Sequence, residues 1–135
     1  MIAVDTSVAV AAALPWHQDH AAARGALPRT RTVAIAQVAI ETYSVLTRLP
    51  QSQRVPAGVA RDYLGQAFVL PPLVLPPEDY ERLIDLAVDE GITGGAVYDA
   101  IVAATAREAG ATLLTLDRRA IPTYERVGTD YRLIG

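Results

Sequence analysis

The chain has 135 residues, 51% of them hydrophobic, and a formal charge of −3. Its length supports one hydrophobic core, so we expect a single domain over residues 1–135. No apolar run is long enough to span a bilayer and no signal peptide opens the sequence, so we expect a cytoplasmic protein rather than a membrane protein. The absence of cysteine excludes thiolate chemistry, which leaves oxygen and imidazole groups for any active site.

Short apolar runs alternate with segments of helical periodicity along the chain. Strands are expected at five apolar runs: Ile2 to Val4, Thr32 to Ile35, Phe68 to Leu75, Thr112 to Leu116 and Tyr131 to Ile134. Helices are expected at six segments: Val8 to Leu14, His17 to Leu27, Gln37 to Leu49, Ala57 to Ala67, Glu78 to Glu90 and Val97 to Ala109. Because the strands are almost continuously apolar, this alternation predicts a three-layer α/β/α sandwich around a five-stranded, mostly parallel sheet.

Two of the predicted strands are followed directly by an aspartate. Asp5 follows the first run and Asp117 follows the run that ends at Leu116. In sheets of this kind, ligands bind beyond the carboxyl ends of the strands, so both aspartates are candidates for a functional site. Each is also compatible with a purely local role, since aspartate at a strand-to-helix junction often caps the helix.

Glu41 shares an apolar helical stripe with Val38, Val45 and Leu49, and this stripe is predicted to face the core. A carboxylate in such a position is unfavourable unless it is paired, protonated or bound to a cation. The alternative is that Glu41 lies at the edge of the stripe and extends its carboxylate into solvent.

Asp99 lies near the start of an alanine-rich helix, on a face of small side chains. An acid in the first helical turn is favoured by the helix dipole, but the small neighbours also leave room for an ion or a phosphate. Several carboxylates at one edge of a sheet disfavour one another's ionisation, and a divalent cation would relieve this. Ligands that are all oxygen suit Mg²⁺ or Mn²⁺, and such an ion supports phosphodiester hydrolysis.

Three stretches of the chain resemble the PIN domains, especially the VapC-type toxins of bacterial toxin–antitoxin pairs: MIAVDTSVAVAAAL, VAIAQVAIETYSVLTRL and GGAVYDAIVAATAREAGATLLTLD. The resemblance implies that Asp5, Glu41, Asp99 and Asp117 form an acidic quartet around one or two Mg²⁺ or Mn²⁺ ions. It also implies a homodimer, a cognate antitoxin protein that neutralises the toxin, and cleavage of structured RNA such as tRNA or rRNA, which would inhibit translation.

Neighbouring polar residues have possible supporting roles. Thr6, Ser7 and Thr115 are candidates for hydroxyls that orient the carboxylates, although local capping and turn hydrogen bonds would explain them equally well. Arg118 and Arg119 follow Asp117 and could contact an RNA phosphate, or could simply be solvated residues at the start of a helix.

Other functions fit the sequence less well. His17 and His20 have metal-ligand spacing but no supporting Cys or His, so we expect exposed residues, and Trp16 is expected to serve packing or dimer contacts. An aspartyl-phosphate enzyme lacks its lysine and a second early aspartate here. Two alternatives to a toxin remain: a housekeeping PIN nuclease in RNA processing, and a non-catalytic binding module on the same fold.

Overall fold

The computed structural model describes residues 1–27 and 32–135, and strands and helices alternate in this part of the chain. The strands are β1 (Ile2–Val4), β2 (Thr32–Ile35), β3 (Phe68–Leu73), β4 (Thr112–Thr115) and β5 (Tyr131–Leu133). Every predicted strand is therefore present. The third is shorter than expected, since it ends before the residues that lead to Pro76 and Pro77.

Helices occupy the segments between the strands. They are α1 (Thr6–Ala13), α2 (His20–Ala26), α3 (Ala36–Thr47), α4 (Ala57–Ala67), α5 (Pro77–Glu90), α6 (Ala96–Glu108) and α7 (Ile121–Val127). Six of them coincide with the predicted helical segments, apart from shifts at their ends, and α7 forms in the short segment after Asp117. Within the described ranges, no helix has both the length and the apolar character needed to cross a membrane.

All strand pairs are parallel, as expected for this class of fold. Hydrogen bonds join β1, β4 and β5 in one set, with β4 in the middle, and β2 and β3 in another. The two sets meet where β1 contacts β2, so the strands do not form the single continuous five-stranded ladder that we expected. The register aligns Val4 with Leu114, which brings the carboxyl ends of β1 and β4 to the same edge.

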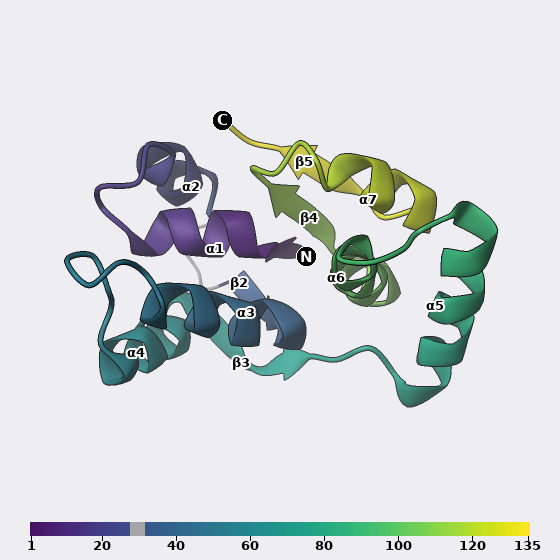
Figure 1. The fold of residues 1–135 in the computed structure, drawn as a ribbon, viewed down its shortest axis with the longest axis horizontal. Helices are drawn as coiled ribbons and strands as arrows, with labels where there is room; N and C mark the ends of the chain where they lie inside the picture. The colour runs from purple at the N-terminus through teal and green to yellow at the C-terminus, as the bar shows by residue number, and fades with distance from the viewer. Residues whose placement is uncertain (28–31) are drawn as a thin grey trace.

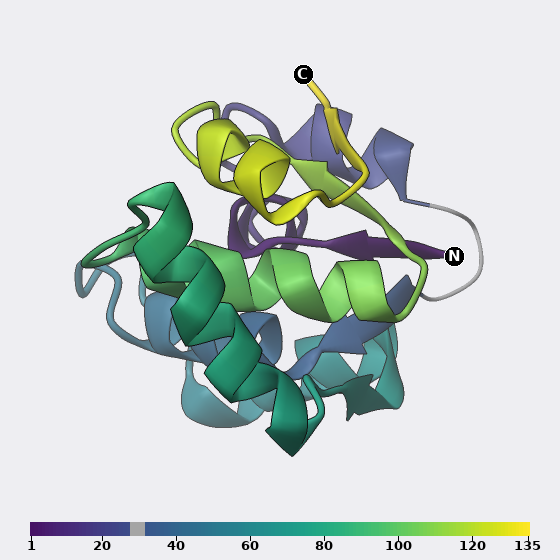
Figure 2. The ribbon, with the colours of Figure 1, turned by 90° about the vertical axis from the view of Figure 1, so that its right-hand side faces the viewer.

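The strands lie between two groups of helices, with α1 to α4 on one side and α5 to α7 on the other (Figure 1). From the second side, α6 runs in front of the strands, α5 crosses over it and α7 lies above it (Figure 2). The expected α/β/α sandwich is thus confirmed. Small side chains such as Ala100 and Ala103, both fully buried, let α6 approach the strands closely.

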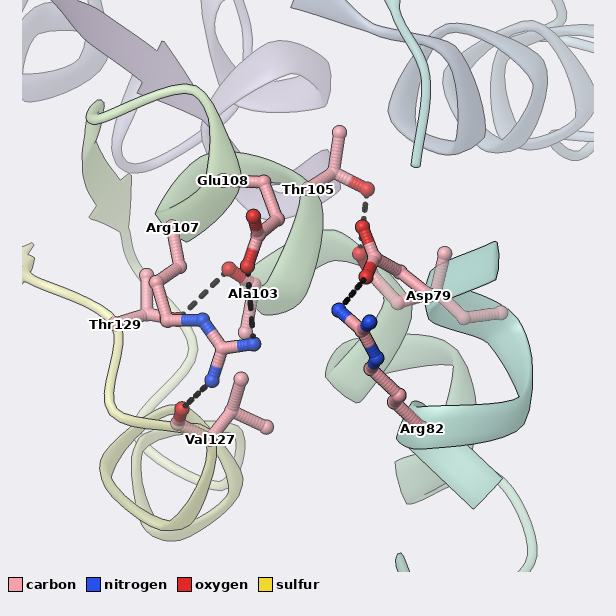
Figure 3. Close-up of polar contacts among 9 residues, drawn as sticks. Asp79, Arg82, Ala103, Thr105, Arg107, Glu108, Val127 and Thr129 are labelled. Atoms are coloured by element: carbon pink, nitrogen blue, oxygen red, sulfur yellow. Dashed lines mark hydrogen bonds and ion pairs between the residues drawn. The ribbon is translucent and has the colours of Figure 1, made fainter. Parts of the chain in front are cut away.

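Hydrogen bonds at the carboxyl end of α6 attach α7 to it (Figure 3). An Arg107 guanidinium nitrogen donates to the Val127 carbonyl at 2.6 Å, and the Thr129 hydroxyl donates to the Ala103 carbonyl at 2.7 Å. Gly128 ends α7 with φ +82°, a conformation that glycine adopts at little cost. Together these contacts hold α7 against α6.

Candidate active site: an acidic cluster at the strand ends

Asp5 lies where β1 passes into α1, and it serves both elements. Its backbone N–H donates to the Leu114 carbonyl at 3.1 Å, which extends the pairing with β4. Its side chain is the N-cap of α1 and accepts a hydrogen bond from Val8 N at 3.3 Å. The capping role considered for Asp5 is therefore real. It does not account for the whole environment, because the residue is only 4% exposed and has further partners.

Three hydroxyl groups also donate to the Asp5 carboxylate. The Ser7 hydroxyl donates to Oδ1, while the hydroxyls of Thr115 and Tyr124 donate to Oδ2, the latter at 2.8 Å. Burial raises the pKa of Asp5, and these hydrogen bonds act in the opposite direction because they favour the ionised form. Burial and the nearby charge of Asp5 raise the pKa of Tyr124, so this phenol stays protonated and can donate.

The hydroxyls of Ser7 and Thr115 connect Asp5 to the end of β4. Each also accepts a backbone hydrogen bond at 2.9 Å: Ser7 from Leu116 N, and Thr115 from Asp117 N. Asp117 thus lies in the same network as Asp5. Its own carboxylate accepts from Arg119 N at 3.0 Å through Oδ1 and remains 35% exposed.

Glu41 reaches this edge from α3. Its carboxylate accepts hydrogen bonds from the Thr6 hydroxyl at 2.7 Å and from the Gln37 amide at 2.9 Å. The predicted stripe is right at Val38, which is buried, but the buried face of α3 continues through Thr42 and Leu46. The prediction that Glu41 shares that face is wrong. Glu41 lies beside that face and is partly exposed, as the edge alternative required.

Asp99 lies in the first turn of α6 and is partly buried. Within residues 1–27 and 32–135, its carboxylate has no hydrogen bond or ion pair. Its pKa is raised to about 6, first by burial and then by the negative charges of Asp117, Asp5 and Glu41. The charges of the other three acids of the predicted quartet thus act on Asp99, and the hydrogen bonds of Thr6, Ser7 and Thr115 connect those three at the same edge.

The donor chemistry of this cluster fits a hard divalent cation. In the described part of the chain, neither carboxylate oxygen of Asp99 has a hydrogen-bond partner, and Asp117 uses only Oδ1. These oxygens are ligands of the kind that such a cation prefers. A cation would also relieve the repulsion that raises the pKa of Asp99. However, among the described residues no three Asp, Glu, His or Cys side chains are arranged so that they could hold an ion directly. Binding would therefore require the side chains to move.

Two residues of this network were not identified from the sequence. Gln37 precedes Glu41 by one helical turn, and this spacing alone could have indicated the contact. Tyr124 is 119 positions from Asp5 and almost fully buried, and no sequence pattern connects it to the site.

The remaining candidates lie away from the carboxylates or in solvent. Arg118 is exposed, and the side chain of Arg119 is 94% exposed with its Nε 3.6 Å from Asp117 Oδ1. The expectation that the histidines are exposed is wrong, since both are partly buried and bonded to nearby backbone. His17 Nδ1 accepts from Asp19 N at 3.0 Å, and His20 Nδ1 lies 2.8 Å from the Ala11 carbonyl. Trp16 is 53% exposed.

Comparisons with known proteins agree with this architecture. A family model described as the PIN domain matches residues 2–127. Ribonuclease VapC40 of Mycobacterium tuberculosis is 46% identical over 134 residues, which cover 99% of each chain. Ribonuclease VapC27 of the same species is 42% identical over 127 residues, covering 94% of this chain and 92% of the relative.

A solved structure described as FitAB bound to an IR36 DNA fragment has a similar fold. The TM-score is 0.68 with 15% sequence identity, and the match covers 98% of this chain and 94% of the other. Parallel strands between helical layers, together with the match to the PIN-domain model over residues 2–127, define an α/β protein of the PIN class. The chain belongs to the PIN-domain family, among its VapC-type ribonucleases, as the sequence resemblance indicated.

Proposed function

We propose that this protein is a metal-dependent endoribonuclease that hydrolyses phosphodiester bonds in structured RNA, such as tRNA or rRNA. The observation that carries the proposal is the Asp99 carboxylate, which lacks a partner in the described part of the chain and is repelled by three other acids. A fold retains such unfavourable charge at a cost, and a bound cation compensates that cost. The ribonuclease names of the relatives, VapC40 and VapC27, support the same activity.

The four acids have unequal parts in this proposal. Asp99 and Asp117 offer free oxygens to Mg²⁺ or Mn²⁺, whereas Asp5 and Glu41 are already oriented by hydrogen bonds. When bound, the ion would lower the pKa of an attacking water and stabilise the charge that develops on the phosphate. The exposed guanidinium groups of Arg118 and Arg119 are free to approach an RNA phosphate.

The proposal includes protein partners, namely a neutralising antitoxin and a second copy of the chain. Apolar side chains exposed on two helices support it: Ile40 on α3 is 71% exposed, and Ile84 and Val88 on α5 are 63% and 77% exposed. A groove of about 500 Å³ lies beside Ile40, and one of about 600 Å³ lies beside Ile84 and Val88. Exposed apolar patches of this kind are typical of surfaces that bind other proteins.

The activity is tested with purified protein, free of any antitoxin, and total RNA. We expect cleavage with Mg²⁺ or Mn²⁺, none with chelator, and a loss of at least about a hundredfold in Asp99→Asn, which removes a charge but no hydrogen bond. Asp5→Asn should also be inactive. Asp85→Asn, on the exposed surface of α5, is the matched control and should cleave normally.

Three results would contradict parts of the proposal. Cleavage that continues with chelator and in Asp99→Asn would contradict the metal mechanism. RNA binding without any cleavage would indicate a binding module. If expression in bacteria does not arrest growth, or if a small neighbouring gene does not relieve the arrest, the toxin role is wrong and a housekeeping nuclease is favoured.

A further inference from the structure

The Asp5 carboxylate has no acceptor position left for a new ligand. An ionised carboxylate offers about four lone-pair positions, two on each oxygen. Oδ1 accepts from the Ser7 hydroxyl and Val8 N, and Oδ2 accepts from the hydroxyls of Thr115 and Tyr124. A cation that is to contact Asp5 must therefore displace one of these four donors.

Three of the donors are held by other bonds. Val8 N belongs to the first turn of α1, and the hydroxyls of Ser7 and Thr115 also accept backbone hydrogen bonds from Leu116 N and Asp117 N. Displacing either hydroxyl from Asp5 would disturb the link between the ends of β1 and β4.

Tyr124 differs from the other donors. In residues 1–27 and 32–135, Asp5 is the only hydrogen-bond partner of its hydroxyl, and the side chain comes from the separate helix α7. Its ring lies 6.3 Å from the ring of Tyr131 and is otherwise enclosed by the core. Releasing this hydroxyl breaks one hydrogen bond and leaves the connection between the strands intact.

We propose that Tyr124 is a positioning residue whose hydroxyl donates to Asp5 Oδ2 and releases this oxygen when a divalent cation binds there. The inference rests on the proposed metal-dependent function. It predicts opposite effects for neighbouring hydroxyls. Removing the Tyr124 hydroxyl frees a lone pair and favours the cation, whereas removing the Ser7 or Thr115 hydroxyl disorders the strand ends and disfavours it.

The test is calorimetric titration of the full chain with Mn²⁺ alone, after removal of divalent ions and without RNA. We expect Tyr124→Phe to bind Mn²⁺ about five- to tenfold more tightly than the wild type, because one fewer hydrogen bond is broken on binding. Thr115→Val and Ser7→Ala should bind it about tenfold more weakly.

Two tyrosine variants serve as controls. Tyr131→Phe removes the hydroxyl of the adjacent ring, which donates to Glu125 at 2.6 Å and touches no acid of the quartet. Tyr63→Phe removes a partly buried hydroxyl that donates to the Ala9 carbonyl at 2.7 Å. Both should bind Mn²⁺ with wild-type affinity.

A second measurement does not require Tyr124→Phe to fold. Adding Mg²⁺ to the wild type should change the near-ultraviolet absorption of tyrosine, because the buried phenol loses its carboxylate partner. The change should persist in Tyr131→Phe. If the wild type binds the ion without this change, or if Tyr124→Phe binds Mn²⁺ no more tightly than the wild type, the inference is wrong while the proposed function stands. If the wild type binds neither ion at millimolar concentration, the proposed function fails, and the inference with it.

Discussion

The end of β1 and the first turn of α6 each contribute an aspartate to the same cluster, but the two aspartates differ in burial and in hydrogen bonding. Asp5 is 4% exposed and accepts four hydrogen bonds. Asp99 accepts none from the described residues and is close to three other negative charges. The fold therefore uses Asp5 as a structural connection between strands and helices, whereas it holds Asp99 at an energetic cost. A proposed ligand set can thus contain one acid whose hydrogen bonds connect the strands and another that accepts no hydrogen bond from the described residues.

The largest effect that would test this contrast is expected from Asp5→Ala. The substitution leaves the buried hydroxyls of Thr115 and Tyr124 without their acceptor and removes the N-cap of α1. We expect the free energy of unfolding to fall by about 2 to 4 kcal/mol in metal-free protein, measured by urea denaturation. Asp85→Ala on the exposed face of α5 should change it by less than about 0.5 kcal/mol. An Asp5→Ala protein as stable as the wild type would contradict the structural role.

Asp99→Asn should increase the free energy of unfolding at neutral pH, whereas Asp5→Ala decreases it. The pKa of Asp99 in the folded protein, about 6, lies above the ordinary value of 3.8, so the folded state binds this proton more tightly than the unfolded state does. Wild-type stability should therefore fall as the pH rises from about 4 to 6, and this fall should be smaller in the variant, where only the raised pKa of Asp5 remains. At neutral pH we expect Asp99→Asn to be more stable by about 1 kcal/mol, after allowing for solvent screening.

Thermal unfolding between about pH 4 and pH 8, with chelator present, measures this difference. Adding Mn²⁺ should then stabilise the wild type more than the variant, because the cation neutralises the repulsion only where the charge exists. A variant less stable than the wild type at neutral pH would show that Asp99 has a stabilising partner after all.

The smallest expected effect comes from removing single buried hydroxyls, one without a hydrogen-bond partner and one with a partner. Thr42 is fully buried on α3, and its hydroxyl has no hydrogen-bond partner among the described residues, unlike that of Thr115. Thr42→Val keeps the shape and removes the unsatisfied group, so we expect a gain of about 1 kcal/mol in the free energy of unfolding. Thr115→Val should lose a similar amount. Equal effects of the two substitutions in chemical denaturation would contradict the assignment of partners.

Much of the fold could be predicted because short patterns of apolar residues indicate the strands and helices. The apolar runs specified the strands, and the ends of two of them specified where Asp5 and Asp117 would meet. The position of Glu41 was harder to predict. Val38, Thr42 and Leu46 form the buried face of α3, and a shift of one residue on a helix changes which side chain faces the core. The break between the two sets of strands was also not predictable, because apolar runs do not specify which neighbours exchange hydrogen bonds.

By itself, the sequence determined the alternation of strands and helices and the parallel sandwich, because periodicity and residue type act over a few neighbouring positions. Its resemblance to the PIN domains indicated the four acids as one set. Only the tertiary structure decided which acid is satisfied and which is not. Asp5 acquires partners from α7 and from the end of β4, more than a hundred residues away, whereas Asp99 acquires three like charges from other elements. Hydrogen bonding and repulsion at this edge depend on distances in space, which the fold alone establishes.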